Sequence, residues 1–265
     1  MRIPKRFNIW GNCAMKVIVF INLKGGVGKT ESAKNLAYVF SEKFGKRVLL
    51  IDDDKQGNTT DSFNLPKNEI ETIADILLND NYDIFNAIYQ TAYPNLHVIG
   101  ANMNLLSANL HLVKDEIREQ PTILRKALQR VQDRFDYCII DNAPDINMSV
   151  INALVAADEV IVPVTIDDDS FSGLKQILVH VEEAKQFNPA LQFKGCLVTK
   201  FMTNSIDAQG KEELRQMGYP VFNTHIRFSK KVREASFRKM PIVAYSPRCG
   251  PSQDYKAFAK ECLGI

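Results

Sequence analysis

Residues 24–30 read Lys-Gly-Gly-Val-Gly-Lys-Thr, so three glycines, two lysines and a hydroxyl group lie in one short segment. The apolar run Lys16–Ile21 precedes this segment and a helix-like stretch follows it, which predicts a strand, a glycine loop and a helix. In that arrangement the N–H groups of the loop and the positive end of the helix bind an anion. Lys29 is placed to reach the β- and γ-phosphates, and Thr30 to ligate Mg²⁺. The segment therefore predicts a site for a nucleoside triphosphate.

Carboxylates follow two of the apolar runs. The run Val48–Ile51 leads into three aspartates, residues 52–54, and the run Tyr137–Ile140 leads into Asp141. In an α/β sheet the strand ends converge on the phosphate loop. There, one carboxylate can hold metal-bound water and another can orient the attacking water. Two such runs behind one glycine loop indicate hydrolysis of the triphosphate with Mg²⁺.

Apolar, β-branched runs alternate with amphipathic stretches along the chain. This alternation predicts an α/β fold, with a doubly wound, mostly parallel sheet flanked by helices. No repeat, linker or shift in composition marks a second domain, so residues 15–265 are predicted to form one domain. The predicted strands are Lys16–Ile21, Arg47–Ile51, Leu96–Ile99, Tyr137–Ile140, Glu159–Val164, Gln192–Thr199 and Pro220–Asn223. The predicted helices are Lys29–Phe44, Glu71–Asn79, Leu105–Lys114, Thr122–Asp133, Met148–Ala156, Phe171–Gln186, Asp207–Met217 and Gln253–Leu263.

The composition excludes several classes of protein. A hydrophobic fraction of 45% is ordinary for a globular core. No apolar run approaches the roughly 20 residues of a membrane-spanning helix. The five cysteines lack the spacing of zinc, iron–sulfur or disulfide sites. Their pattern indicates a protein of the reducing cytosol.

A basic stretch lies near the C-terminus. Between residues 227 and 248, seven basic residues stand against one acid, Glu234, which gives a local charge of +6 in a chain of net charge +2. Such a run is either a solvated face or a surface for the phosphates of DNA. Residues 1–14 form a basic extension that either adds a DNA contact or precedes the natural start at Met15. The basic residues of the C-terminal stretch are Arg227, Lys230, Lys231, Arg233, Arg238, Lys239 and Arg248.

Five segments together resemble the deviant-Walker-A ATPases of the ParA/Soj partition family, within the MinD-like superfamily. Residues 24–31 read K-G-G-V-G-K-T-E for the family's K-G-G-V-G-K-T-T, and residues 49–58 read L-L-I-D-D-D-K-Q-G-N for L-L-I-D-x-D-P-Q-G-N. Residues 137–144 read Y-C-I-I-D-N-A-P for Y-I-I-I-D-x-P-P. Residues 157–164 read A-D-E-V-I-V-P-V for A-D-x-V-I-V-P-V, and residues 221–226 read V-F-N-T-H-I for V-F-x-T-x-I. The resemblance covers nearly the whole chain from residue 16 onward.

The resemblance implies a role for the residues of the loop and of the strand ends. Lys24 is similar to the signature lysine that reaches across an ATP-sandwich homodimer to the partner's phosphates, where a second cation offsets developing charge. Thr30 would ligate Mg²⁺, with Asp141 holding metal-bound water. Asp54 would position the attacking water, and Asp52 would close on the loop and the metal. The catalytic residues would be Lys24, Lys29 and Asp54, and the nucleotide-binding residues Lys24, Gly25, Gly26, Val27, Gly28, Lys29, Thr30, Glu31 and Asp52.

Some residues depart from the family pattern. Glu31 replaces a threonine, and because a carboxylate repels phosphate, it should point away from the nucleotide and nucleotide affinity should fall. Lys55 replaces a proline, which loosens the turn after the strand and should slow hydrolysis. Residues 167–169, all aspartate, are predicted to cap the helix at Ser170, and Asp53 is predicted to be a solvated side chain.

The family further implies an ATP-bound homodimer on non-specific double-stranded DNA. Lys231 aligns with an arginine that the family uses for this binding. A ParB-like centromere-binding protein would stimulate an otherwise slow hydrolysis and release the dimer. The protein would then be cytoplasmic, associated with the nucleoid and not with a membrane. The DNA-binding residues would be Arg227, Lys230, Lys231, Arg233, Arg238 and Lys239.

Three alternative functions stay open on the sequence. A MinD-like positioning ATPase would need a C-terminal amphipathic helix with a broad apolar face and a basic flank. Residues 253–263 instead resemble a helix docked on the body of the protein. A biosynthetic or kinase enzyme could use the same loop. A nucleotide-gated scaffold or repressor that barely hydrolyses ATP is favoured by Glu31 and Lys55.

Overall fold

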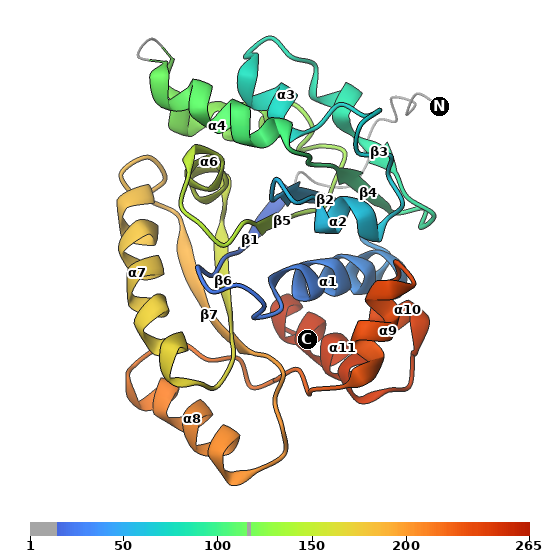
Figure 1. Ribbon diagram of the computed structural model, residues 1–265, viewed down its shortest axis with the longest axis vertical. Helices are drawn as coiled ribbons and strands as arrows, with labels where there is room; N and C mark the ends of the chain where they lie inside the picture. Colours follow the sequence, from blue (N-terminus) through green and yellow to red (C-terminus); the bar gives the residue numbers. More distant parts are fainter. Residues whose placement is uncertain (1–14, 116–117) are drawn as a thin grey trace.

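The computed structural model describes residues 15–115 and 118–265, so the basic extension at residues 1–14 lies outside the described part. Within that part, seven strands form one sheet in the order β3-β4-β2-β5-β1-β6-β7 (Figure 1). Paired strands run parallel, except that β3 is antiparallel to β4. The predicted mostly parallel α/β sheet is therefore confirmed. The strands are β1 (Lys16–Phe20), β2 (Val48–Asp53), β3 (Tyr89–Gln90), β4 (Leu96–Ile99), β5 (Tyr137–Asn142), β6 (Glu159–Val164) and β7 (Gln192–Val198).

The strand register places the functional edge of the sheet. β1 lies between β5 and β6, with Phe20 opposite Asp141, and Asp52 of β2 lies opposite Asp141 on the other side of β5. The carboxyl ends of β1, β2 and β5 therefore meet at one edge. The chain continues from β1 to β2 on one side and reaches β6 on the other, and doubly wound sheets bind their ligands at such a switch point.

Helices cover both faces of the sheet (Figure 1). One face buries an apolar cluster under α3 to α8, which includes Leu105 and Val150. The other buries a second cluster under α1, α9, α10 and α11, which includes Leu36 and Phe258. No helix within residues 15–115 and 118–265 combines the length and the apolarity that crossing a bilayer requires. The α-helices are α1 (Lys29–Phe44), α2 (Asn58–Ser62), α3 (Ile73–Leu78), α4 (Asn104–Lys114), α5 (Ile123–Gln129), α6 (Met148–Ala156), α7 (Asp168–Ala184), α8 (Ser205–Gln216), α9 (Lys230–Phe237), α10 (Ile242–Tyr245) and α11 (Gly250–Leu263), and two 3₁₀ turns span Ile84–Ala87 and Gln120–Thr122.

Several elements have the predicted bounds, among them α1, α6, β4 and β6. The predicted strand Pro220–Asn223 is wrong. That segment runs beside β7 but makes a single bridge, between Val221 and Cys196. Pro220 has no N–H to extend the ladder toward the N-terminus, and the next acceptor on β7, the Val198 carbonyl, accepts from the Ile226 N–H further along the chain. The short helices α2 and α10 and the basic helix α9 were not predicted.

Candidate active site

The glycine loop is held in shape by the strands around it. Asn22, at the end of β1, is buried; its Nδ2 donates to the Pro163 carbonyl at 2.7 Å and its Oδ1 accepts from the Lys24 N–H at 2.9 Å. Gly28 has a φ of 87°, a left-handed conformation that a residue with a Cβ adopts only with strain. The Thr199 hydroxyl donates to the Val27 carbonyl at 2.7 Å. The loop is therefore shaped for a ligand by contacts with β6 and the end of β7.

Lys29 lies inside the loop rather than on its surface. Its Nζ donates to the carbonyls of Asn22, at 2.8 Å, and Lys24, at 3.2 Å. Burial lowers the pKa of Lys29, while Asp141 and Asp54 act in the opposite direction. The structure thus brings the loop ammonium into the field of the carboxylates at the strand ends, as the sequence predicts.

Asp141 and Thr30 form a site that fits a cation. Asp141 is buried at the end of β5, where its Oδ2 accepts a hydrogen bond from the Thr59 hydroxyl at 2.7 Å. Its Oδ1 is buried and has no hydrogen-bond partner among the described residues. Burial raises the pKa of Asp141 to about 6, against the hydroxyls of Thr59 and Thr30 and the Lys29 ammonium. A buried carboxylate oxygen with an open position, beside a threonine hydroxyl, suits Mg²⁺ or its bound water.

The three aspartates after Ile51 have three different surroundings. Asp52 is buried, and its Oδ2 accepts from the N–H and the hydroxyl of Thr60 at 2.7 and 2.6 Å. Burial, together with the charge of Asp141, raises the pKa of Asp52 to about 8. This carboxylate is therefore bonded to α2 in this structure. Asp54 lies half-buried beyond the end of β2, where its Oδ1 accepts from the Gln56 N–H at 2.9 Å.

The prediction that Asp53 is solvated is wrong. β2 continues through Asp53, which lies opposite Asn142 of β5 and is fully buried. Neither of its carboxylate oxygens has a hydrogen-bond partner among the described residues. Burial raises the pKa of Asp53 well above its ordinary value. The nearby Ser149 hydroxyl lowers this pKa in part, but its proton is donated to the side chain of Asn147 and not to Asp53. Asp53 is thus a buried carboxyl group on the sheet and not a surface charge.

Lys24, at the entrance of the loop, forms an ion pair. Its Nζ lies 2.6 Å from Oδ1 of Asp167, and Oδ2 of Asp167 accepts from the Thr165 hydroxyl at 2.6 Å. α7 begins at Asp168, two residues before the predicted start at Ser170, and Asp167 occupies its N-cap position. Lys55, which stands in the place of the family's proline, pairs with Asp145 at 3.7 Å.

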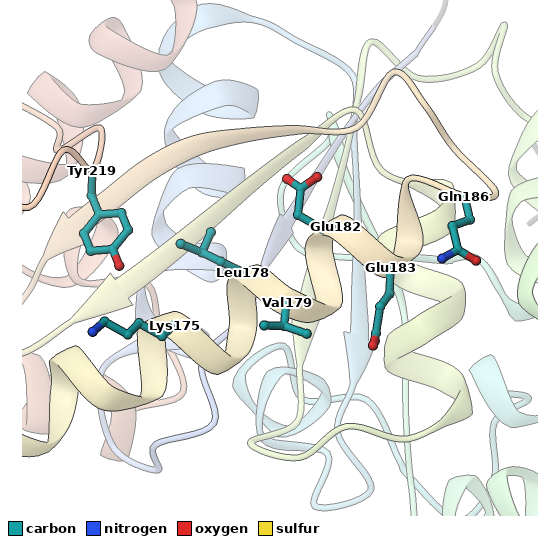
Figure 2. Close-up of a pocket in the computed structure, with 7 residues that line it drawn as sticks. All are labelled: Lys175, Leu178, Val179, Glu182, Glu183, Gln186 and Tyr219. Carbon is teal, nitrogen blue, oxygen red and sulfur yellow. The ribbon is translucent and has the colours of Figure 1, made fainter.

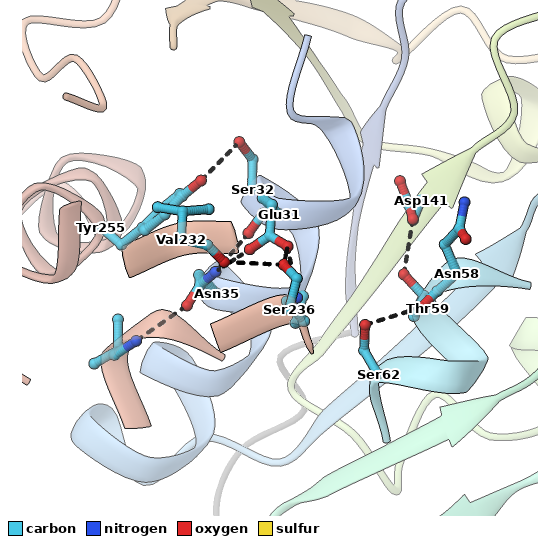
Figure 3. Close-up of polar contacts among 12 residues, drawn as sticks. Glu31, Ser32, Asn35, Asn58, Thr59, Ser62, Asp141, Val232, Ser236 and Tyr255 are labelled. Carbon is cyan, nitrogen blue, oxygen red and sulfur yellow. Dashed lines mark hydrogen bonds and ion pairs between the residues drawn. The ribbon is translucent and has the colours of Figure 1, made fainter. Parts of the chain in front are cut away.

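Glu31 points toward α9, away from the loop, as predicted (Figure 3). Its Oε1 accepts from Lys34 Nζ at 2.8 Å and also from the Ser236 hydroxyl, and its Oε2 accepts from Asn35 Nδ2 at 3.3 Å. The Lys34 side chain is completely buried, whereas that of Glu31 is 20% exposed. This departure from the family pattern therefore joins the first turn of α1 to the basic helix α9.

The candidate DNA-binding residues divide into two groups. Lys230, Lys231 and Arg233 are exposed on α9, and Arg238 and Lys239 are exposed directly after it. Arg227 is also exposed, but it is engaged in contacts within the fold. Its Nη2 donates to Asp254 at 2.7 Å and to the Gly250 carbonyl at 3.1 Å, so it holds the beginning of α11.

Sequence reasoning missed the residues that support the site. Thr59 and Thr60 bond the two strand-end aspartates, and Asn22 anchors the loop. The position of Asn22 at a strand end next to the glycine loop is the one signal that could have found it. A separate hollow of about 490 Å³ runs along α7, and none of its lining residues belongs to the loop or the strand ends (Figure 2). The lining residues are Lys175, Leu178, Val179, Glu182, Glu183, Gln186 and Tyr219.

The sequence is similar to that of known proteins along most of its length. Residues 15–193 match the family described as an AAA domain. The chain is 36% identical over 249 residues to the sporulation initiation inhibitor protein Soj of Bacillus subtilis, covering 93% of this chain and 97% of that protein. It is 34% identical over 251 residues to the chromosome-partitioning ATPase Soj of Treponema pallidum, covering 94% and 97% of the two chains.

A solved structure with nucleotide and metal has the same fold. Cobyrinic acid a,c-diamide synthase from Mycobacterium smegmatis, with a bound ATP analogue and magnesium, superposes with a TM-score of 0.81 and 25% sequence identity, covering 94% of each chain. The similarity to both Soj proteins agrees with the geometry of the site, in which buried carboxylates lie behind a phosphate loop. The chain belongs to the ParA/Soj family of P-loop ATPases and is an ATPase that uses ATP with Mg²⁺.

Proposed function

We propose that this ATPase partitions DNA. In this proposal the ATP-bound homodimer binds double-stranded DNA without sequence specificity through α9 and the residues that follow it. A ParB-like centromere-binding protein then stimulates hydrolysis and releases the dimer. The observation that carries the proposal is the exposed basic surface on and directly after α9, formed by Lys230, Lys231, Arg233, Arg238 and Lys239. The bond between Glu31 and Ser236 joins this surface to the helix that begins at the phosphate loop.

Hydrolysis would use the groups already gathered at the carboxyl edge of the sheet. Lys29 and the loop N–H groups would hold the β- and γ-phosphates, in place of the loop carbonyls that Lys29 now bonds. Asp54, half-buried beyond β2, would orient the attacking water. Thr30 and Asp141 would hold Mg²⁺, which offsets phosphate charge when bound.

Lys24 would complete the site of a second copy. Its ammonium lies outside the loop, in an ion pair with Asp167, and the side chain is 34% exposed. Lys24 is thus at the molecular surface next to its own phosphate site. In an ATP-sandwich dimer it would exchange Asp167 for the partner's phosphates and offset charge that Lys29 and Mg²⁺ leave over.

The C-terminal helix favours this function over membrane positioning. Tyr255 and Phe258 of α11 are 2% and 0% exposed and pack in the apolar cluster beneath α1. The helix is therefore docked on the body, as predicted, and its apolar side chains are used within the fold. A membrane anchor needs such a face exposed.

The slow-hydrolysing scaffold is the second candidate. It is favoured by Lys55, which stands in the place of the family's proline and pairs with Asp145. It is also favoured by the bond of Asp52 to Thr60, because this bond engages within the fold the carboxylate that is expected to close on the loop and the metal. Steady-state turnover with ATP, DNA and a ParB-like partner separates the two candidates. Partition requires turnover that rises when DNA and partner are both present, whereas a scaffold would keep its basal rate.

The test of the proposal is retention on DNA as a function of nucleotide. Wild-type protein should be dimeric with ATP by light scattering and should be retained on a duplex without a centromere sequence. Asp54→Ala should remain dimeric and DNA-bound but should not hydrolyse ATP, and Lys24→Ala should remain monomeric. An ATP-loaded wild type that stays monomeric on and off duplex at every concentration would refute the proposal.

A further inference from the structure

An aromatic side chain is exposed within the basic surface of α9. Phe237 is 87% exposed, more than any other large apolar side chain within the described part of the chain. Phe228, just before α9, is 57% exposed. Neither side chain is needed for the apolar cluster beneath α9, which takes Ala235 and part of Val232. The exposure of Phe237 therefore has no explanation in the packing of the fold.

Helix geometry places Phe237 beside two of the cations. Residues three, four and seven positions apart lie on one side of a helix, so Lys230, Arg233 and Phe237 share a face. The opposite side faces the protein, since Ala235 is buried and Ser236 bonds Glu31. The outward face of α9 thus combines two cations with one phenyl ring.

The charges around this face are predominantly positive. Arg238 and Lys239 follow Phe237 and are exposed. The acid on α9, Glu234, accepts a hydrogen bond from the Tyr245 hydroxyl at 3.3 Å. The ring is therefore presented in a positive field, which attracts a polyanion and brings it against the phenyl group.

Contact with phosphates alone needs cations and gains little from an exposed ring. Cations next to an aromatic ring are the combination that contacts bases, either by stacking on an unpaired base or by a wedge between base steps. We propose that Phe237 contacts nucleobases when α9 binds DNA, a proposal that rests on the DNA-binding function proposed above. The free energy of DNA binding then includes a contribution from the ring that salt does not screen.

An anionic membrane is the competing occupant, and the structure disfavours it. α9 has eight residues, and its outward face carries one phenyl ring. A single acyl chain anchors a protein to a bilayer only marginally, and Phe237, even together with the partly exposed Phe228 just before α9, offers no larger apolar area. The flanking cations would attract a phosphate backbone and an anionic lipid surface alike, so the ring decides between the two.

The test compares loss of the ring with loss of a charge. Binding of the ATP-bound protein to a fluorescent duplex, and to a single strand of the same sequence, is measured over a range of KCl concentrations. Phe237→Ala should weaken binding by about tenfold at every salt concentration, with the salt slope unchanged. Phe237→Trp should restore binding. Arg233→Ala should instead reduce the salt slope by about 0.9.

Phe187→Ala is the matched control, because Phe187 is 45% exposed after the end of α7 and lies outside the basic stretch. It should bind as the wild type does. A stronger effect of Phe237→Ala on the single strand than on the duplex indicates stacking, and the reverse indicates a wedge between paired bases.

Equal binding by wild type and Phe237→Ala overturns the base contact and leaves the proposed partition function standing. If the wild type does not bind DNA with ATP, both proposals fall. If Phe237→Ala loses binding to phosphatidylglycerol vesicles but keeps DNA binding, the ring serves a membrane and the base contact is wrong.

Discussion

The pair Glu31–Lys34 gives the sharpest test of how the site helix is held. Lys34 is completely buried, and its ammonium donates to the Glu31 carboxylate at 2.8 Å. Glu31→Ala removes that acceptor and leaves a buried cation. Breaking a buried pair costs about 3–5 kcal/mol. Because the Glu31 side chain is 20% exposed, water can replace part of the interaction, and we expect a loss of roughly 2–3 kcal/mol of unfolding free energy.

For a chain of this size that loss corresponds to a fall in Tm of roughly 5–10 °C. Urea denaturation and calorimetry of wild type, Glu31→Ala, Lys34→Met and the double variant measure it. The double variant should recover most of the stability, because it leaves no unpaired charge in the interior. Loss of the carboxylate near the helix N-terminus alone accounts for about 0.3–1 kcal/mol. A Glu31→Ala loss within that range, with no recovery in the double variant, refutes the reasoning.

Three further predictions concern the loop, the sheet and the basic stretch. Lys29→Ala should abolish ATP binding in calorimetric titration; micromolar affinity would refute the loop assignment. Asp53→Asn should stabilise the protein by about 1–3 kcal/mol at pH 7. Because the folded pKa of Asp53 is raised, wild-type stability falls as pH rises above the unfolded pKa, so this gain should vanish below about pH 4. Arg227→Ala should lower Tm through the loss of its bonds to Asp254, whereas an effect on the salt slope of DNA binding would place Arg227 in the DNA surface.

The sequence predicted the parts of the site that are local along the chain. The glycine loop and the aspartates after β2 and β5 follow from spacing within a few residues, and parallel strands bring their ends together. The error at Asp53 has a physical cause. The apolar run ends at Ile51, but pairing with β5 continues for two residues, and sequence composition does not determine register.

Contacts between distant residues could not be predicted in the same way. Glu31 and Ser236 are 205 positions apart, and nothing in either segment specifies the other. Helix α9 was not predicted because few of its side chains are apolar and face the core: Ala235 is buried and Val232 is partly buried. In so short and highly charged a segment, two apolar residues do not give a recognisable helical period of hydrophobicity. The contacts between the first turn of α1 and the basic helix α9 are therefore found only in the three-dimensional structure.

Through those contacts, α1 connects the phosphate loop at its N-terminus to the helices α9 and α10. Its first turn holds α9 through Glu31 and Ser236, and its second holds α10, since the Val243 N–H donates to Asn35 at 3.3 Å. A displacement of the loop by nucleotide must therefore move α9 or break these bonds. Coupling of this kind is reciprocal in free energy. If ATP tightens the binding of DNA by some factor, DNA must tighten the binding of ATP by that same factor, and both effects must shrink together when the Glu31–Ser236 bond is removed.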